Sequence, residues 1–357
     1  MTQRAIVVAV ETRALHEAID SELDEFEALA RAAGAKILDR IVQRRDAVDA
    51  ATLVGSGKAN EIAQRAHEEK ADLLLVLNDL RPRQRKNLEK IIPLPIVDRT
   101  MLILDVFARH ARSREGKVQV ELAQLRYRQS NLIGAGAELS RLGGGIGTRG
   151  PGETKLEVDR RRIAQRIAAL NVALHNIRRQ RALRRSGRQR EPLVALVGYT
   201  NVGKSSLLNA MTRSDAYVAD RPFATLDPTI RRAYLGPGSY VRLADTVGFI
   251  TDLPKELVTA FRATLEELRE ADLLVHVLDA SNARWMAQRR AVDAILAQLE
   301  LDGVPALAVF NKCDRAVPEA LGQTGALYVS AKTSEGLDSL RAAIGQRVAT
   351  IKDAEKE

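Results

Sequence analysis

The sequence predicts an α/β protein of three parts, on three observations. Short apolar runs alternate with helical patterns at both ends of the 357-residue chain, which indicates two parallel sheets flanked by helices. The middle carries apolar residues at helical spacing on either side of a glycine-rich stretch, which predicts an antiparallel helical hairpin with a Gly-rich tip. A phosphate-binding sequence follows the first apolar run of the C-terminal part. We expect a small N-terminal parallel α/β domain over residues 1–98, a basic hairpin and linker over 99–190, and a C-terminal P-loop domain over 191–357.

The N-terminal part contains three expected strands, Ala5–Val10, Ala35–Val42 and Leu73–Leu77. Helical patterns lie between them, around Ala14–Ala33 and Lys58–Glu69. Strands separated by helices imply a small parallel sheet, which two prolines close before residue 98.

The middle part contains two helical stretches with apolar residues on one face. These residues are Val118, Leu122, Leu125 and Leu132 in the first stretch, and Leu156, Ile163, Ile167, Leu170, Leu174 and Ile177 in the second. Their spacing is typical of a coiled-coil seam. The segment between them, residues 139–153, is the expected tip, and a helix over about 154–180 would be about 40 Å long. The arginine-rich segment 178–190 is expected to be the helix end and a hinge.

The C-terminal part contains four continuous apolar runs, as expected of strands buried on both faces. They are Leu193–Val197, Val241–Ala244, Leu273–Leu278 and Ala306–Phe310.

The net charge of +9 is concentrated in the middle part. Residues 109–190 hold 20 Lys and Arg against 6 Asp and Glu, a net of +14, whereas residues 1–108 hold 16 against 18 and residues 191–357 hold 19 against 22. A solvated helix usually mixes both signs, so we interpret the middle segment as a contact for a polyanion. RNA fits better than a membrane, because the basic residues are mainly arginine and lie beside a glycine-rich loop. Arg141 and Arg149 are the expected phosphate contacts at the tip.

A phosphate-binding loop stands at the start of the C-terminal part. It matches G-x-x-x-x-G-K-[ST] and consists of Gly198, Tyr199, Thr200, Asn201, Val202, Gly203, Lys204 and Ser205, followed by Ser206 at the start of a helix. Backbone N–H groups at a helix N-terminus cradle phosphates. Lys204 is expected to neutralise the β- and γ-phosphates as a catalytic residue, and the Ser205 hydroxyl to bind Mg²⁺.

Three further motifs, each at the end of an apolar run, indicate guanine nucleotide. Asp245-Thr-Val-Gly248 offers a carboxylate that can hold Mg²⁺ through a water and a Gly248 N–H for the γ-phosphate. Asn311-Lys312-Cys313-Asp314 places a carboxylate against guanine N1–H and N2–H₂, a donor pair that adenine lacks. Ser330, Ala331 and Lys332 follow the last strand, where the Ala331 N–H is expected to reach guanine O6. Ligands bind at the carboxyl ends of parallel strands, so the four motifs predict a GTPase site.

Two residue assignments in the catalytic site have alternatives, that of the switch threonine and that of Asn201. Thr225 is the expected switch residue that ligates Mg²⁺ when GTP is bound, with Thr229 as its rival. Phe249 stands where small Ras-like GTPases place a glutamine that orients water, so slow intrinsic hydrolysis is expected. Asn201 is either a ligand for a monovalent cation, a role that K⁺ fills in related GTPases, or an ordinary turn residue.

The chain resembles the HflX family of bacterial GTPases, over about residues 40–345. The resemblance rests on residues 115–125, on the glycine-rich residues 142–156, and on the segments 223–229, 245–250 and 260–267. It implies an N-terminal domain, a helical hairpin and a GTPase domain that bind the large ribosomal subunit and its rRNA and split stalled or idle 70S ribosomes. The sequence ends just after the last expected GTPase helix, whereas many members continue into a small C-terminal domain, which leaves that domain's ribosomal contacts open.

Three function classes follow from these features. The first is a ribosome-directed GTPase that splits or rescues ribosomes, and the second is a GTP-gated RNA-binding or assembly module without splitting activity. The third, a GTPase peripheral at the membrane, is disfavoured because no amphipathic anchor or lipidation signal is found. The single cysteine, Cys313, fits a reducing cytosol, and no signal peptide or apolar run of ~18 residues is present. We expect a cytoplasmic monomer without stable membrane insertion.

Overall fold

The computed structural model describes two compact units of the chain. Its described residues are 2–12, 19–142, 151–185, 191–212, 222–223, 229–251, 253–255, 257–258, 269–315 and 326–354, without the side chains of 133–142, 151–156, 178 and 181–185. The first unit joins residues 1–109 with 117–178, and the second joins 110–116 with 179–357. The hairpin therefore groups with the N-terminal sheet, while the domain boundaries at 98/99 and 190/191 stay a prediction.

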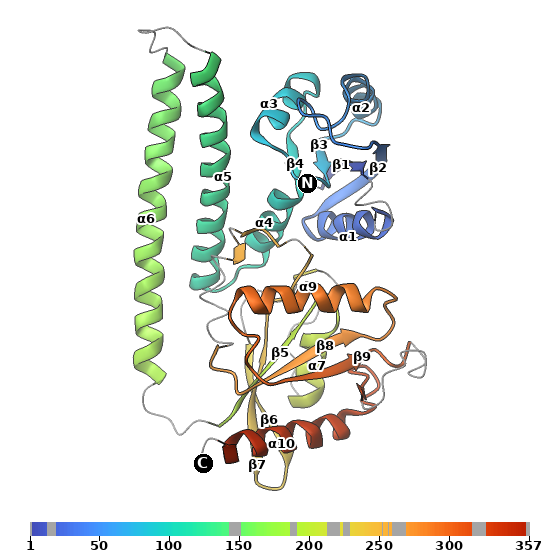
Figure 1. The fold of residues 1–357 in the computed structure, drawn as a ribbon, viewed down its shortest axis with the longest axis vertical. Helices are drawn as coiled ribbons and strands as arrows, with labels where there is room; N and C mark the ends of the chain where they lie inside the picture. The colour runs from blue at the N-terminus through green and yellow to red at the C-terminus, as the bar shows by residue number, and fades with distance from the viewer. Residues whose placement is uncertain are drawn as a thin grey trace. The chain divides into compact units, whose positions relative to one another are not determined.

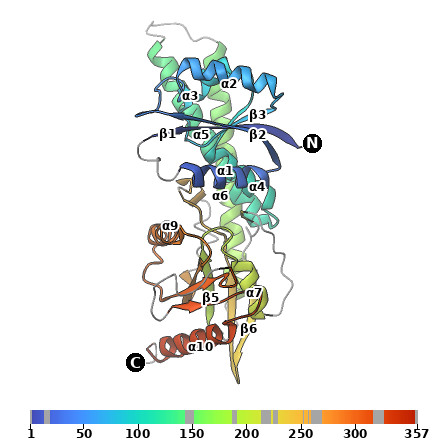
Figure 2. The ribbon, with the colours of Figure 1, turned by 90° about the vertical axis from the view of Figure 1, so that its right-hand side faces the viewer.

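The N-terminal sheet has four parallel strands in the order β2-β1-β3-β4. The strands are β1 (Gln3–Glu11), β2 (Ala35–Arg44), β3 (Leu73–Val76) and β4 (Ile96–Asp98). Figure 2 shows α2 (Ser56–Glu68) and α3 (Pro82–Ile91) on one face, and α1 (Ile19–Ala32) and α4 (Arg99–His110) on the other. Because both faces of β1 are covered, its residues from Ala5 onward are all buried, which explains the unbroken apolar run.

The three predicted strands and the helix predicted around Lys58–Glu69 are confirmed. Helix α1 confirms the described part of the helix predicted around Ala14–Ala33, whereas α3 and β4 were not predicted. The ten residues of α3 read PRQRKNLEKI, and only Gln84 and Leu88 are buried, so the apolar periodicity is too weak to reveal a helix. The strand β4 has three residues and directly follows Pro95. The prolines that we expected to close the sheet therefore precede its last strand.

The hairpin consists of α5 (Arg114–Leu142) and α6 (Pro151–Arg185), which run side by side in Figure 1. Of the ten residues expected in the seam, Leu122, Leu170 and Leu174 are buried. Six others are half-buried, and the side chain of Leu156 lies outside the described part. Arg166 adds a bidentate ion pair across the helices to Glu121, at 2.7 and 3.0 Å. Both helices reach into the predicted tip, 139–153, because α5 ends at Leu142 and α6 begins at Pro151, a residue compatible with a first helical turn. Helix α6 is described as far as Arg185, within the arginine-rich segment.

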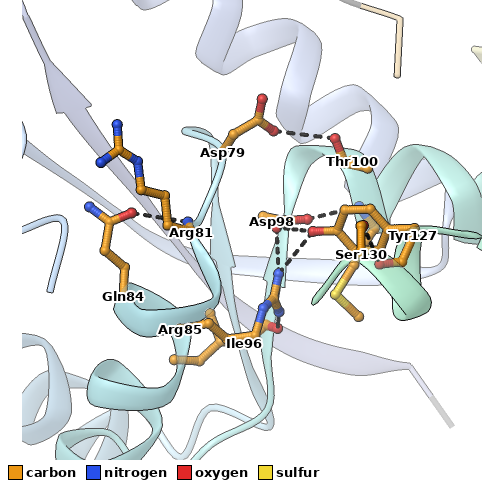
Figure 3. Close-up of polar contacts among 10 residues, drawn as sticks. Asp79, Arg81, Gln84, Arg85, Ile96, Asp98, Thr100, Tyr127 and Ser130 are labelled. Carbon is orange, nitrogen blue, oxygen red and sulfur yellow. Dashed lines mark hydrogen bonds and ion pairs between the residues drawn. The ribbon is translucent and has the colours of Figure 1, made fainter. Parts of the chain in front are cut away.

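A buried carboxylate joins the hairpin to the N-terminal sheet (Figure 3). Asp98, the last residue of β4, is 1% exposed and accepts hydrogen bonds from Arg85 of α3 and Tyr127 of α5. Its other oxygen accepts the N–H of Met101 at 2.9 Å, at the start of α4. Burial raises the pKa of the Tyr127 hydroxyl well above its usual value, so this group stays a donor. One charge thus holds three helices to the end of one strand.

The second unit contains a six-stranded sheet in the order β10-β9-β8-β5-β7-β6, with only β6 antiparallel to its neighbour among the described strands. The strands are β5 (Leu193–Gly198), β6 (Thr229–Gly236), β7 (Ser239–Asp245), β8 (Leu273–Asp279), β9 (Ala306–Asn311) and β10 (Leu327–Tyr328). Helix α9 (Trp285–Gln298) lies on one face, and α7 (Lys204–Thr212) and α10 (Leu337–Ala354) lie on the other (Figure 1). The four predicted strands are confirmed as β5, β7, β8 and β9. Within the described residues, no helix has the length and apolar character needed to cross a bilayer.

Candidate nucleotide site

The phosphate-binding loop connects β5 to α7, as its sequence predicts. Gly203 has φ +93°, and a Cβ there would lie 2.3 Å from Asn311 Nδ2, so only glycine fits. Asn201 also adopts a left-handed conformation, with φ +61°, which asparagine tolerates better than most residues. The side chain of Asn201 is exposed, which is compatible with both interpretations of this residue.

Lys204 is buried at the centre of this loop. Its ammonium donates to the carbonyl oxygens of Gly198 at 3.0 Å and Tyr199 at 2.8 Å. Burial lowers the pKa of Lys204 to about 8, although the nearby Asp245 carboxylate acts in the opposite direction. The loop therefore holds a poorly solvated ammonium group, which a bound phosphate would stabilise by charge pairing.

Nucleotide affinity should depend on pH through Lys204. Bound phosphates would raise its pKa again, so binding above pH 8 must be accompanied by uptake of a proton. We expect GDP affinity to be constant from pH 7 to 8 and to fall by up to about tenfold per unit above pH 8. Calorimetry in buffers of different ionisation enthalpy would detect the proton.

The control is Lys204→Arg, whose guanidinium stays protonated and should remove this pH dependence whatever its affinity. A wild-type affinity that is flat between pH 7 and 9 would contradict the assignment.

Two oxygen ligands converge at the start of α7. The Ser205 hydroxyl donates to Asp245 Oδ2 at 2.5 Å, and Asp245 is the last residue of β7. Hydroxyl and carboxylate oxygens suit Mg²⁺, which also keeps waters and phosphate oxygens as ligands. The described residues contain no group of three or more His, Cys, Asp or Glu that could hold a metal by itself. The donor set therefore fits a metal that is held jointly with nucleotide phosphates.

The loop after β7 is pressed against the phosphate-binding loop. A Cβ at Gly248 would lie 2.8 Å from Thr200 Cα, so this position has no room for a side chain. Phe249 pairs with the loop through its backbone, since its N–H donates to Gly198 O at 3.1 Å and its carbonyl accepts the Thr200 N–H at 2.7 Å. Its ring is buried, 2% exposed, and so belongs to the core rather than to a water-orienting position.

The loop after β9 is tied to the phosphate-binding loop by two side chains. Asn311 Nδ2 donates to Val202 O at 2.8 Å, and Lys312 Nζ donates to Asn201 O at 2.7 Å. Lys312 also forms an ion pair with Asp279, the last residue of β8, at 2.7 Å. Sequence reasoning missed Asp279, although a carboxylate that ends a buried strand at this edge was a usable signal.

The Asp314 carboxylate is solvent-exposed and accepts a hydrogen bond from Ser330 Oγ at 2.7 Å. This bond is the main cause that lowers the pKa of Asp314, so the group is ionised at neutral pH. The Ala331 N–H donates to Asn311 Oδ1 at 3.0 Å in this structure, and Lys332 beside it is exposed. The structure thus brings all three predicted guanine motifs to the same edge of the sheet.

Some predicted residues lie outside the described part. Thr225 and Arg149 belong to undescribed segments, and only the backbone of Arg141 is described, near the end of α5. Thr229, the rival of Thr225, is the first residue of β6 and pairs with Asp245 in the sheet. The roles of all four residues stay predictions.

The fold and this arrangement define a P-loop GTPase. A mostly parallel sheet carries the phosphate-binding loop after β5, a carboxylate after β7 and the Asn-Lys-x-Asp sequence after β9, all at the carboxyl ends of the strands.

Comparison with known proteins specifies the family. Models described as "GTP-binding GTPase N-terminal", "GTP-binding GTPase Middle Region" and "50S ribosome-binding GTPase" match residues 20–108, 110–188 and 193–312. The chain is 48% identical to the GTPase HflX of Caldanaerobacter subterraneus subsp. tengcongensis, over 96% of this chain and 80% of that protein. It is 43% identical to the GTPase HflX of Escherichia coli (strain K12), over 92% and 79%. The chain belongs to the HflX family of GTPases.

A solved structure supports the same architecture. A crystal structure of SsGBP in complex with GDP matches with a TM-score of 0.53, at 23% identity, over 98% of this chain and 99% of that chain. At this identity the likeness concerns the fold.

Proposed function

We propose that this GTPase binds the large ribosomal subunit through its basic hairpin and uses GTP binding and hydrolysis to split or rescue 70S ribosomes. The observation that carries the proposal is the concentration of net charge +14 in residues 109–190, in a chain whose other parts are slightly acidic. The match of residues 193–312 to a family described as a 50S ribosome-binding GTPase supports the same partner.

The hairpin has properties that suit an RNA-lined space. It is long and narrow, and arginines such as Arg160, Arg161 and Arg162 are exposed on α6. Glu121, one of the few acids of this segment, is already paired with Arg166. Exposed arginines on a segment with an excess of positive charge are available to phosphates.

In the nucleotide site we assign each group one role. Lys204 contacts the β- and γ-phosphates, and the Gly248 N–H contacts the γ-phosphate. Mg²⁺, which supplies charge neutralisation on the phosphates, would be held by Ser205 and Thr225, and by Asp245 through a water. Asp314 recognises the guanine base.

Sedimentation tests the proposed function. With GTP and this protein, 70S particles should separate into subunits. Particles that remain whole while the protein co-sediments with them would instead support a GTP-gated RNA-binding or assembly module. Liposome flotation of the same protein would reveal a membrane partner.

Hydrolysis should depend on the monovalent cation if Asn201 is a ligand. Asn201 is an exposed residue of the phosphate-binding loop, and its backbone carbonyl accepts a hydrogen bond from Lys312. We expect turnover in the presence of ribosomes to be severalfold higher in K⁺ than in Na⁺, and Asn201→Ala to abolish the difference.

A matched control is Asn282→Ala, an asparagine outside the phosphate loop whose amide oxygen accepts the Arg284 N–H. This variant should keep the preference for K⁺. Equal wild-type rates in both salts would leave Asn201 as a turn residue.

A further inference from the structure

The ion pair between Asp279 and Lys312 lies at the edge of the sheet that carries the nucleotide motifs. Lys312 Nζ lies 2.7 Å from Asp279 Oδ2 and 2.7 Å from the carbonyl oxygen of Asn201. The pair is shielded from solvent, with side chains 12% and 20% exposed. A single ammonium therefore links the end of β8 to the phosphate-binding loop.

Asp279 is itself held in place by local contacts. Its Oδ1 accepts hydrogen bonds from the N–H of Ser281 at 2.9 Å and from the Ser281 hydroxyl at 2.6 Å. Its backbone pairs with Asn311 in the sheet, so it sits beside the Asn-Lys-x-Asp loop. One oxygen thus shapes the turn after β8, and the other is directed at Lys312.

The contact acts on a strained part of the phosphate loop. Asn201 has φ +61°, and its carbonyl and that of Val202 are held by two consecutive residues, Lys312 and Asn311. A shielded ammonium needs a counter-charge, because an unpaired one would be displaced towards water. Loss of Asp279 should therefore free Lys312 and, with it, the Asn201 carbonyl.

We propose that Asp279 is a positioning residue for nucleotide binding, which holds Lys312 Nζ against the Asn201 carbonyl and thereby keeps the phosphate loop in its binding conformation. This inference rests on the nucleotide site assigned under Proposed function. It adds a residue whose carboxylate contacts Ser281 and Lys312.

The test compares nucleotide dissociation from four variants. Asp279→Ala and Lys312→Ala should each speed GDP release by about tenfold or more, the effect of losing a charge-assisted hydrogen bond. The double variant should resemble either single one, because both substitutions remove the same link. Asp279→Asn, which keeps the acceptor oxygen but not the charge, should fall between wild type and Asp279→Ala. For GTP hydrolysis, KM should rise while kcat at saturating GTP stays near the wild-type value.

Ser281→Ala is the matched control. It removes the hydroxyl bonded to Oδ1 and leaves the contact between Asp279 Oδ2 and Lys312. If Asp279 only stabilised the turn, Ser281→Ala would speed GDP release as Asp279→Ala does, and the proposal would be overturned.

Two other results would also overturn the proposal. The first is a GDP release rate equal to that of the wild type in both Asp279→Ala and Asp279→Asn. The second is a double variant whose GDP release is accelerated by the product of the two single effects. Failure of the proposal can be distinguished from an incorrect nucleotide site. If the site itself is incorrect, Lys312→Ala also leaves the rate of GDP release unchanged. Should Asp279→Ala fail to fold, Asp279→Asn decides the matter, with thermal melting as the check on its folding.

Discussion

Asp314→Asn should weaken GTP binding at least tenfold and improve binding of xanthine nucleotide. The carboxylate pairs with two donors that guanine presents, and loss of one charge-assisted hydrogen bond costs about 1.5–3 kcal/mol. Xanthine has an acceptor where guanine has its amino group, so an amide can replace the carboxylate there. The hydrogen bond from Ser330 keeps Asp314 ionised and oriented before nucleotide arrives.

Titration with labelled GTP and xanthosine triphosphate analogues would measure both changes. The control is Asp338→Asn, a fully exposed carboxylate of the same unit that pairs with Arg341 on the surface of α10. It should bind both nucleotides as the wild type does. Unchanged GTP affinity in Asp314→Asn would refute the guanine assignment.

The second large effect is expected at the hairpin tip. Arg141→Ala combined with Arg149→Ala should lower ribosome-stimulated hydrolysis and subunit splitting, and leave isolated GTP binding and the basal rate unchanged. The nucleotide site belongs to the other compact unit, so its chemistry does not require these arginines. The glycines around the tip let backbone approach RNA closely, and the two arginines would position it.

A charge-matched control separates position from charge. Arg160→Ala with Arg161→Ala removes the same charge from an exposed part of α6. Each lost phosphate contact should reduce the slope of log binding constant against log salt concentration by about one unit. Splitting by the bound protein should persist. If the tip variant splits ribosomes at the wild-type rate, the hairpin is only a spacer.

Most of the buried strands, and the nucleotide motifs at their ends, were predictable from the sequence because buried strands leave unbroken apolar runs. The run that became β8 is fully buried from Leu273 to Asp279, and polar residues at such strand ends mark the site. The same rule pointed to Asp245 and Asn311.

The features that could not be predicted from the sequence depend on contacts between segments that are distant in the chain. Helix α3 is almost entirely polar, and its place follows from Leu88 and from the contact of Arg85 with Asp98. The ion pair between Asp279 and Lys312 joins residues 33 apart in sequence, and no local sequence pattern predicts it. The Ala331 N–H, expected at guanine O6, donates to Asn311 in this structure, a partner that only the fold brings within reach.

GTP hydrolysis measured with and without purified large ribosomal subunits tests the central claim most directly. If the chain is a ribosome-directed GTPase, large subunits should raise its turnover by about tenfold or more, because Phe249 leaves the isolated site without a water-orienting side chain. Small subunits at the same concentration should have little effect. A rate that is the same with and without large subunits would contradict the account.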